Sequence, residues 1–289
     1  LLSAGLHSEE ANSWAEALKP EQILRRVMWI AANTMNSQLL QKSTELLLAM
    51  VDSQKEAALT LIPPLVYLGL PELLTDLLTC EITAITEGIP AHGDVVLDTI
   101  LQIGEALSLA DKHSQELASD KKLFGLACKV IKISGKDEVG PPGITAAVLV
   151  ANLLAEEEKL IDEILYDAKF LQNLLQLLPS ASDDPGARNA LWSVLGRMFD
   201  GLETSQEMQA SKRELVSVLV SQSDLIAEDL DDHREEDTGE DEKIHFSKQS
   251  DIATFNKRFK AKIGTVSKMI HVLDDWIKTE EESSVQDLS

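Results

Sequence analysis

Apolar residues recur every three or four positions along most of the chain, which is the spacing of one face of an α-helix. Between Ser37 and Asp52 this stripe contains Leu39, Leu40, Ser43, Leu46, Leu47, Met50 and Val51. An alternating strand pattern cannot select that set, because it requires every second residue. The sequence therefore predicts an all-α protein.

The same periodicity predicts about eleven helices in the first 227 residues, joined by links of a few residues. Their expected ranges are 12–18, 20–34, 37–52, 54–68, 71–86, 93–111, 115–133, 143–156, 158–178, 185–203 and 205–227. Short links favour antiparallel neighbours that stack in order along the chain.

Residues that begin or end helices mark several of these bounds. Gly69 is placed to end one helix before Pro71 begins the next, and Asp184 to cap the helix that starts at Pro185. Three pairs fit the capping box, in which a hydroxyl and a carboxylate satisfy helix amides reciprocally: Ser13 with Glu16, Ser53 with Glu56, and Thr204 with Glu207. The dipeptide Pro63-Pro64 predicts a kink or a split in the fourth helix.

The composition changes after residue 227. Residues 228–242 contain ten acidic side chains and one basic one, so 228–248 is predicted to be a disordered acidic loop. An amphipathic helix is predicted over 249–278, as the last helix of the same array, followed by a frayed tail over 279–289. We therefore expect one helical region over 1–227, the loop, and this terminal helix.

Consecutive helices of this kind form either a solenoid or a globular bundle. A doubled-apolar pattern favours the solenoid, since it occurs both in Leu73-Leu74-Thr75-Asp76-Leu77-Leu78 and in Phe170-Leu171-Gln172-Asn173-Leu174-Leu175. The second copy is followed by a Pro/Ser/Asp loop and then by the apolar helix at 189–195, an order that resembles the armadillo repeat. This resemblance implies an armadillo/HEAT-like right-handed superhelix of about eleven to twelve helices, with a plain bundle as the alternative. The candidate partner-binding residues on its groove are Leu73, Asp76, Lys169, Gln172 and Asn173.

Composition narrows the possible functions. The 26 basic and 49 acidic side chains leave a net charge of −23, which disfavours direct binding of nucleic acid through a basic surface. The longest apolar run covers only 144–155, too short for a membrane span. Two cysteines, Cys80 and Cys128, cannot form a disulfide framework, and both are expected to be buried thiols of a protein in a reducing compartment.

The sequence contains few candidates for catalysis. It lacks the common nucleophile, zinc-protease and phosphate-loop motifs, so no catalytic, cofactor or metal residue is predicted and the protein is expected not to be an enzyme. An Asp-rich magnesium site at Asp231-Asp232-His233-Arg234-Glu235 is the alternative, disfavoured because it lies inside the acidic run. The four tryptophans, Trp14, Trp29, Trp192 and Trp276, are interpreted mainly as core residues, with interface anchors as the alternative.

A basic segment follows the acidic run. Lys257, Arg258, Lys260 and Lys262 fall within six residues and match a short nuclear-import pattern. Because the segment lies in a predicted helix, pairing with the acidic run is the favoured interpretation, and import is the alternative.

Scattered apolar positions over about half the chain resemble the SAAL (serum-amyloid-A-like) family of armadillo-type proteins. They are Trp14-Ala15-Glu16-Ala17-Leu18, Ile23, Ile30, Thr34-Met35-Asn36-Ser37, Leu39-Leu40, Val51-Asp52, 70–78, 170–178, Ser182-Asp183-Asp184-Pro185 and Trp192-Ser193-Val194-Leu195. The resemblance implies a non-enzymatic, largely nuclear protein linked to cell proliferation, of which this chain would be an N-terminally incomplete copy. We accordingly expect a monomeric protein-interaction scaffold with an unidentified protein partner, and a chaperone or transport adaptor as the alternative.

Overall fold

The computed structural model describes residues 2–110, 114–119, 121–134 and 141–204, with short pieces between 214 and 226. The described residues form helices and no strand, which confirms the all-α prediction. The segments 228–248, 249–278 and 279–289, the motif at 231–235, Trp276 and the basic residues Lys257, Arg258, Lys260 and Lys262 lie outside the described residues.

The chain divides into two compact units, Leu1–Leu160 and Ile161–Ser289. This division falls inside the range 1–227 that the sequence suggests is one continuous array, at a point where composition does not change.

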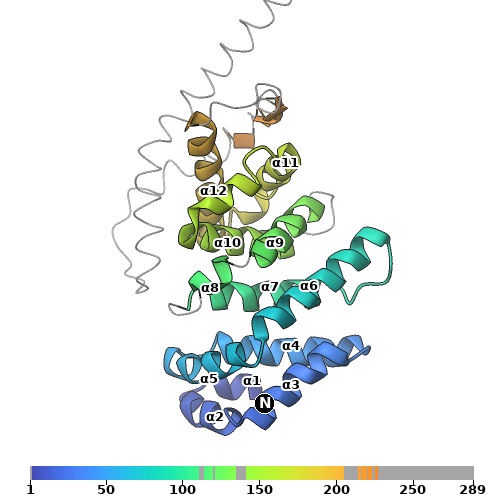
Figure 1. The fold of residues 1–289 in the computed structure, drawn as a ribbon, viewed down its shortest axis with the longest axis vertical. Helices are drawn as coiled ribbons and strands as arrows, with labels where there is room; N and C mark the ends of the chain where they lie inside the picture. The colour runs from blue at the N-terminus through green and yellow to red at the C-terminus, as the bar shows by residue number, and fades with distance from the viewer. Residues whose placement is uncertain are drawn as a thin grey trace, which may run out of the picture. The chain divides into compact units, whose positions relative to one another are not determined.

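The helices of the first unit follow closely the ranges that periodicity predicts (Figure 1). They are α1 (Leu2–Leu6), α2 (Ala11–Leu18), α3 (Glu21–Asn33), α4 (Ser37–Val51), α5 (Lys55–Tyr67), α6 (Leu70–Glu87), α7 (Asp94–Ser108), α8 (Ser114–Ser119), α9 (Lys121–Ser134) and α10 (Pro141–Glu156). Two differences stand out: periodicity does not predict α1, and the single helix expected over 115–133 is two helices, α8 and α9.

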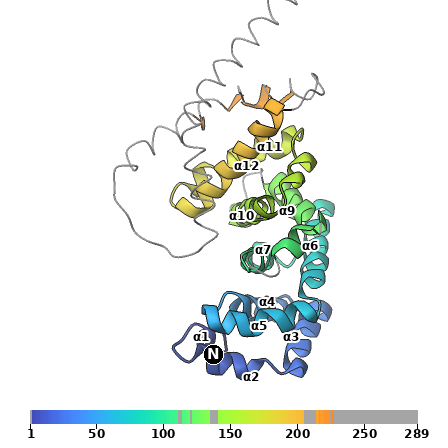
Figure 2. The ribbon, with the colours of Figure 1, turned by 60° about the vertical axis from the view of Figure 1, so that its left-hand side comes forward.

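Helices three apart in the chain pack against each other in this unit. α2 contacts α5; α3 contacts α6, which contacts α9; and α4 contacts α7, which contacts α10. Figure 2 shows α3, α6 and α9 following one side of the unit, with α4, α7 and α10 beside them. The first unit is thus a stack of three helix triplets, α2–α4, α5–α7 and α8–α10.

Side-chain bonds between successive triplets have a nearly constant sequence separation. Asn12 bonds to Glu56, Lys122 to Asp76, Thr145 to Asp98 and Asn152 to Ser108, across 44, 46, 47 and 44 residues. A constant separation of this size is the mark of a structural repeat of about 45 residues, because equivalent positions of neighbouring repeats then face each other.

The predicted helix ends are partly right. Gly69 has the left-handed backbone (φ 92°) between α5 and α6, where a side chain would be strained. Two of the three capping boxes are wrong: α2 begins at Ala11, so Ser13 lies inside it, and Gln54 precedes α5 while Glu56 accepts a bond from Asn12. Glu207 of the third lies outside the described residues. Pro63 and Pro64 do not split α5, which continues to Tyr67.

In the second unit the structure describes α11 (Ala168–Gln176), the short 3₁₀ segment η2 (Pro179–Ala181) and α12 (Pro185–Thr204), besides the short pieces between 214 and 226. The 3₁₀ segment η1 (Glu158–Glu163) spans the unit boundary. The single helix expected over 158–178 is interrupted because the Asp167 carboxylate accepts a bond from the Phe170 amide and begins α11 anew. Asp184 caps α12 as predicted, accepting from the amides of Gly186 and Ala187.

Candidate functional site

An open groove lies along helices α3 and α6. Its volume is about 710 Å³, and its lining comes from α3, from the corner between α5 and α6, and from the first turns of α6. The lining residues are Gln22, Arg25, Arg26, Met28, Trp29, Ala32, Asn33, Leu68, Gly69, Leu73 and Asp76.

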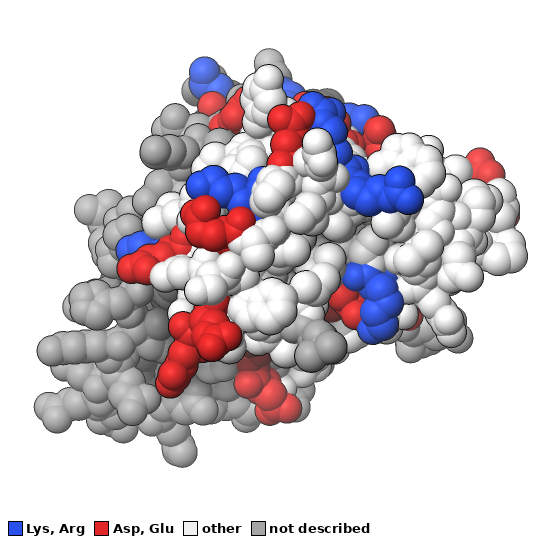
Figure 3. Space-filling view, turned by 90° about the horizontal axis from the view of Figure 1, so that it is seen from below, with Lys and Arg blue, Asp and Glu red and all other residues white. Residues whose placement is uncertain are grey.

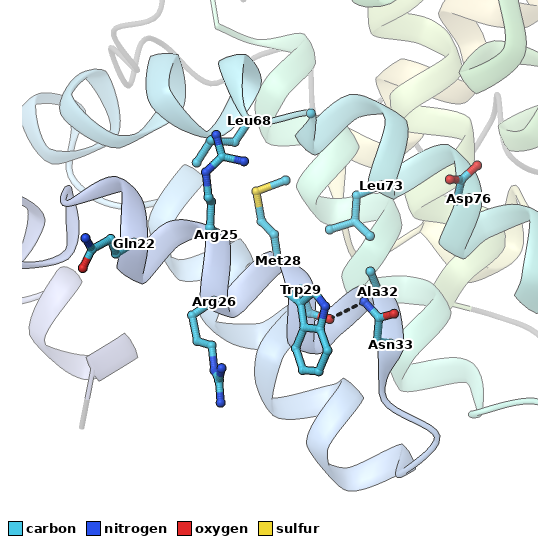
Figure 4. Close-up of a pocket in the computed structure, with 11 residues that line it drawn as sticks. Gln22, Arg25, Arg26, Met28, Trp29, Ala32, Asn33, Leu68, Leu73 and Asp76 are labelled. Carbon is cyan, nitrogen blue, oxygen red and sulfur yellow. Dashed lines mark hydrogen bonds between the residues drawn. The ribbon is translucent and has the colours of Figure 1, made fainter.

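The middle of the groove is apolar and its two ends carry opposite charges. Figure 4 shows Met28, Trp29 and Leu73 between the arginines Arg25 and Arg26 on one side and Asp76 on the other. Met28 and Leu73 are buried and form the floor, whereas Trp29 remains exposed. A segment bound here would bury apolar surface at its centre and meet a cation at one end and a carboxylate at the other.

Trp29 is the most unusual residue of the groove, because 59% of its surface is exposed. The guanidinium of Arg26 lies over its ring, 5.6 Å from the centroid, which is a cation–π contact. One turn later the Asn33 side chain donates a hydrogen bond of 2.9 Å to the Trp29 carbonyl (Figure 4). An exposed tryptophan with an arginine beside it has the composition of an interaction hot spot.

The charges around the groove are mostly paired. Arg25 bonds Glu21 at 2.6 Å, and Lys122 of α9 lies 3.5 Å from Asp76. Arg26, by contrast, has no carboxylate partner within the described part of the chain. Figure 3 shows acidic and basic side chains interleaved over the face seen from below, with no extended patch of one sign among the described residues there.

The sequence-predicted residues divide between this groove and the second unit. Leu73 and Asp76 line the groove. In α11, Lys169 is exposed and Gln172 is half-buried, but Asn173 is 1% exposed. The assignment of Asn173 to a partner surface needs correction, since its side chain belongs to the core of its own unit.

The interpretation of the tryptophans also changes. Trp192 is buried and Trp14 packs on Gly5, where an added Cβ would lie 2.6 Å from the indole, but Trp29 is not a core residue. A signal for this exists in the sequence. The buried positions of α3 are Leu24, Met28 and Ala31, and Trp29 lies on the opposite, largely polar face with residues 22, 25, 26 and 33.

The two cysteines differ as well. Cys128 is buried, as expected, but Cys80 is exposed on α6. The apolar stripe of α6 includes Leu74 and Leu78, and Cys80 falls outside it.

Two other polar clusters hold helices together. The buried Glu81 carboxylate of α6 accepts bonds from both the ring Nδ1 and the backbone amide of His92, which fixes the link between α6 and α7. Asp98 of α7 accepts bonds from Thr145 of α10 (2.7 Å) and Gln102 (2.8 Å), and its burial raises the pKa of its carboxyl while these bonds lower it. Both clusters are therefore explained by their role in holding neighbouring helices together.

Neither a metal cluster nor a membrane span is found in the described part of the chain. Those residues hold no group of three or more His, Cys, Asp or Glu side chains arranged to bind a metal ion. Among the same residues no single helix is long and apolar enough to cross a membrane; α5 and α6 reach that composition only together, as a pair bent by 74°.

No protein-family model matches this sequence, and no curated protein matches it significantly. The resemblance to the SAAL family therefore remains a hypothesis.

Proposed function

We propose that the protein is a non-enzymatic interaction scaffold of the armadillo/HEAT kind, and that a segment of a partner protein binds in the groove along α3 and α6. The observation that carries the proposal is Trp29, a large aromatic side chain held exposed in a groove of about 710 Å³. Exposing an indole to water is unfavourable, and a partner that covers it recovers that free energy.

The stacked triplets support the armadillo-like part of the proposal. Repeats of about 45 residues bury their faces only against neighbouring repeats, and such stacks present continuous surfaces to long binding partners. The proposed superhelix makes a measurable prediction: X-ray scattering of the monomer should give a radius of gyration well above the roughly 19 Å of a compact globule with 289 residues. A value near that of the globule would contradict it.

Groove binding can be tested by comparing two variants that each remove one exposed apolar side chain. Trp29→Ala removes the indole from the groove wall. Leu59→Ala removes a side chain that is 64% exposed on α5 and does not line the groove. The wild-type 289-residue chain and both variants are immobilised, and proteins retained from isotope-labelled cell extract are quantified.

We expect some proteins to be retained by the wild type and by Leu59→Ala and lost with Trp29→Ala. A purified member of that set should bind the wild type at least about tenfold more tightly than Trp29→Ala in calorimetry. Equal retention by the two variants would show that the groove is not the binding surface.

A nuclear location and a link to proliferation are also part of the proposal, and they rest on the family resemblance and on the import pattern at Lys257, Arg258, Lys260 and Lys262. Imaging of the tagged chain with all four residues changed to alanine tests the location. Nuclear accumulation should fall relative to the unchanged chain; an unchanged distribution would remove the import role.

A further inference from the structure

Within the described residues, Arg26 is the groove-lining cation that has no ion pair with a carboxylate. Its neighbour Arg25 already donates from Nε and Nη2 to one oxygen of Glu21, both at 2.6 Å. The guanidinium of Arg26 instead lies against the Trp29 ring, with no carboxylate partner in the described ranges. Stacking on the ring restrains the arginine side chain, so less conformational entropy is lost when a ligand binds it.

The unit around this cation is acidic. Residues 1–160 contain 22 acidic and 12 basic side chains, a net charge of −10. Several other cations of the unit are paired with carboxylates close in sequence or in a neighbouring helix: Lys19 with Glu16, Lys42 with Glu45, and Lys122 with Asp76. An arginine that stays beside an aromatic ring in such an environment remains available for a carboxylate supplied from outside.

We propose that the groove binds an acidic segment of a partner protein, with a partner carboxylate on the Arg26 guanidinium and a large apolar side chain against Trp29 and Leu73. This inference rests on the proposed function and specifies its ligand. A guanidinium binds a carboxylate through two parallel hydrogen bonds, which makes the pair both strong and directional.

Asp76 gives the bound segment a direction. It lies at the opposite end of the groove from Arg25 and Arg26 (Figure 4). A second partner carboxylate there would meet a like charge and would compete with Asp76 for Lys122, which lies 3.5 Å from it. The preferred ligand therefore has its acidic residue at the Arg26 end, an apolar residue in the middle, and a neutral or basic residue at the Asp76 end.

Selection from a random peptide library tests the proposal even though the partner is unidentified. Phage-displayed random 12-residue peptides are selected on the wild-type 289-residue chain and, separately, on Arg26→Ala, Trp29→Ala and Lys55→Ala. Lys55 is an exposed lysine at the start of α5 that does not line the groove, so its replacement removes the same charge elsewhere.

Peptides selected on the wild type and on Lys55→Ala should be enriched in Asp or Glu next to a large apolar residue. A synthetic peptide from that selection should bind Arg26→Ala at least about tenfold more weakly than the wild type, and Lys55→Ala within about twofold. Arg26→Lys should recover only part of the loss, because lysine keeps the charge but not the paired geometry or the stacking. Since Arg26 and Trp29 are exposed on a helix, both alanine variants should keep the helical content of the wild type.

Several results would overturn the proposal. Enrichment in Lys or Arg, or no charge preference, would contradict an acidic ligand, as would equal binding to Arg26→Ala and Lys55→Ala. Selection that appears only after residues 228–242 are deleted would make the chain's own acidic run the occupant instead of a partner. If the peptides selected on wild type show no acidic preference and Trp29→Ala selects none, the groove remains the binding surface and only the acidic ligand is contradicted. If Trp29→Ala and wild type select the same peptides, both the groove as binding surface and the acidic ligand are contradicted.

Discussion

Neighbouring residues of α3 have opposite environments. Met28 is 8% exposed and forms the groove floor, and Trp29, one residue later, is the groove wall. A step of one residue turns a helix by about 100°, so a tryptophan next to the buried stripe points away from the core however apolar it is. The helical period could therefore have identified Trp29 as an exposed residue, whereas its apolar residue type alone led to its wrong assignment to the core.

At the residue scale, Asp98 makes a prediction about pH. A carboxyl with a raised pKa binds more protons in the folded than in the unfolded state, so its contribution to stability falls as pH rises from its ordinary value of 3.8 through the raised folded value. Asp98→Asn lacks this charge. Its free energy of unfolding relative to wild type should be higher at pH 7 than at pH 4, by less than about 1 kcal/mol because solvent screens the half-buried group.

Urea denaturation of both proteins at the two pH values measures this difference. The comparison with wild type removes the general loss of stability that an acidic chain undergoes at low pH. A difference that grows as the pH falls would have the wrong sign for a carboxyl penalised by burial.

The pair of Glu81 and His92 makes a second prediction at this scale. Glu81 is 2% exposed, and the His92 ring and amide are its partners. His92→Ala removes the ring and leaves a buried carboxylate with one bond fewer, which should lower the free energy of unfolding at pH 7 by about 1–3 kcal/mol. Chemical denaturation measures the change, and His7→Ala, at an exposed histidine, should alter stability by less than about 0.5 kcal/mol. Equal effects of the two changes would show that the pair does not stabilise the link.

At the scale of the element, α7 and α10 illustrate how closely the repeats pack. Asn152 donates a hydrogen bond of 3.0 Å to Ser108 in the buried contact between them, and Gly104 of α7 faces Leu149 of α10. A Cβ added at Gly104 would lie 3.2 Å from Leu149 Cδ2. The glycine is there because it permits this approach, although glycine weakens a helix.

Two glycine substitutions separate helix propensity from packing. Gly125→Ala in α9 meets no atom within 4 Å and should raise the free energy of unfolding by about 0.5–1 kcal/mol. Gly104→Ala has the same gain in propensity but crowds Leu149, so we expect a net loss of about 1 kcal/mol. Thermal or urea unfolding of the two variants shows whether each substitution raises or lowers the free energy of unfolding. A stabilised Gly104→Ala would mean that Leu149 moves aside without cost.

Helix ends are less predictable than helix faces. The ends at Gly69 and Asp184 follow from the sequence because each residue has one strong local reason to be there, a left-handed backbone and an amide cap. Ser53 and Glu56 fit a capping pattern too, but the Ser53 hydroxyl donates to the Met50 carbonyl of the preceding helix, and Glu56 bonds to Asn12 of the neighbouring triplet. A local contact to the preceding helix and a contact across 44 residues thus both compete with the capping pattern and prevail over it.

At the scale of the molecule, the repeat spacing becomes measurable only from contacts. The two doubled-apolar segments begin at Leu73 and Phe170, which does not define a period near 45 residues. The bonds across 44–47 residues do define one, because they join neighbouring triplets at a nearly constant separation.

The distribution of charge makes a prediction for the whole chain. Nine of its 23 net negative charges lie within residues 228–242, ahead of the basic residues from Lys257 to Lys262. If these two segments pair, deleting 228–242 should uncover the bases and increase retention on heparin, in a manner that added salt reverses. Unchanged retention of the deletion variant, relative to the full chain, would contradict the pairing.

The sequence by itself determined the helical class, most helix ranges and the absence of common catalytic motifs, because these depend on local periodicity and on residue types in short windows. Two of the five partner-binding candidates, Leu73 and Asp76, lie in the groove. Both belong to α6, a helix whose range the periodicity predicts. Only the tertiary structure decided that α3 lies beside α6, that Trp29 and Arg26 meet there, and that Asn173 is internal. Those facts depend on which helices pack together across some 45 residues, and no pattern within a single helix carries that information.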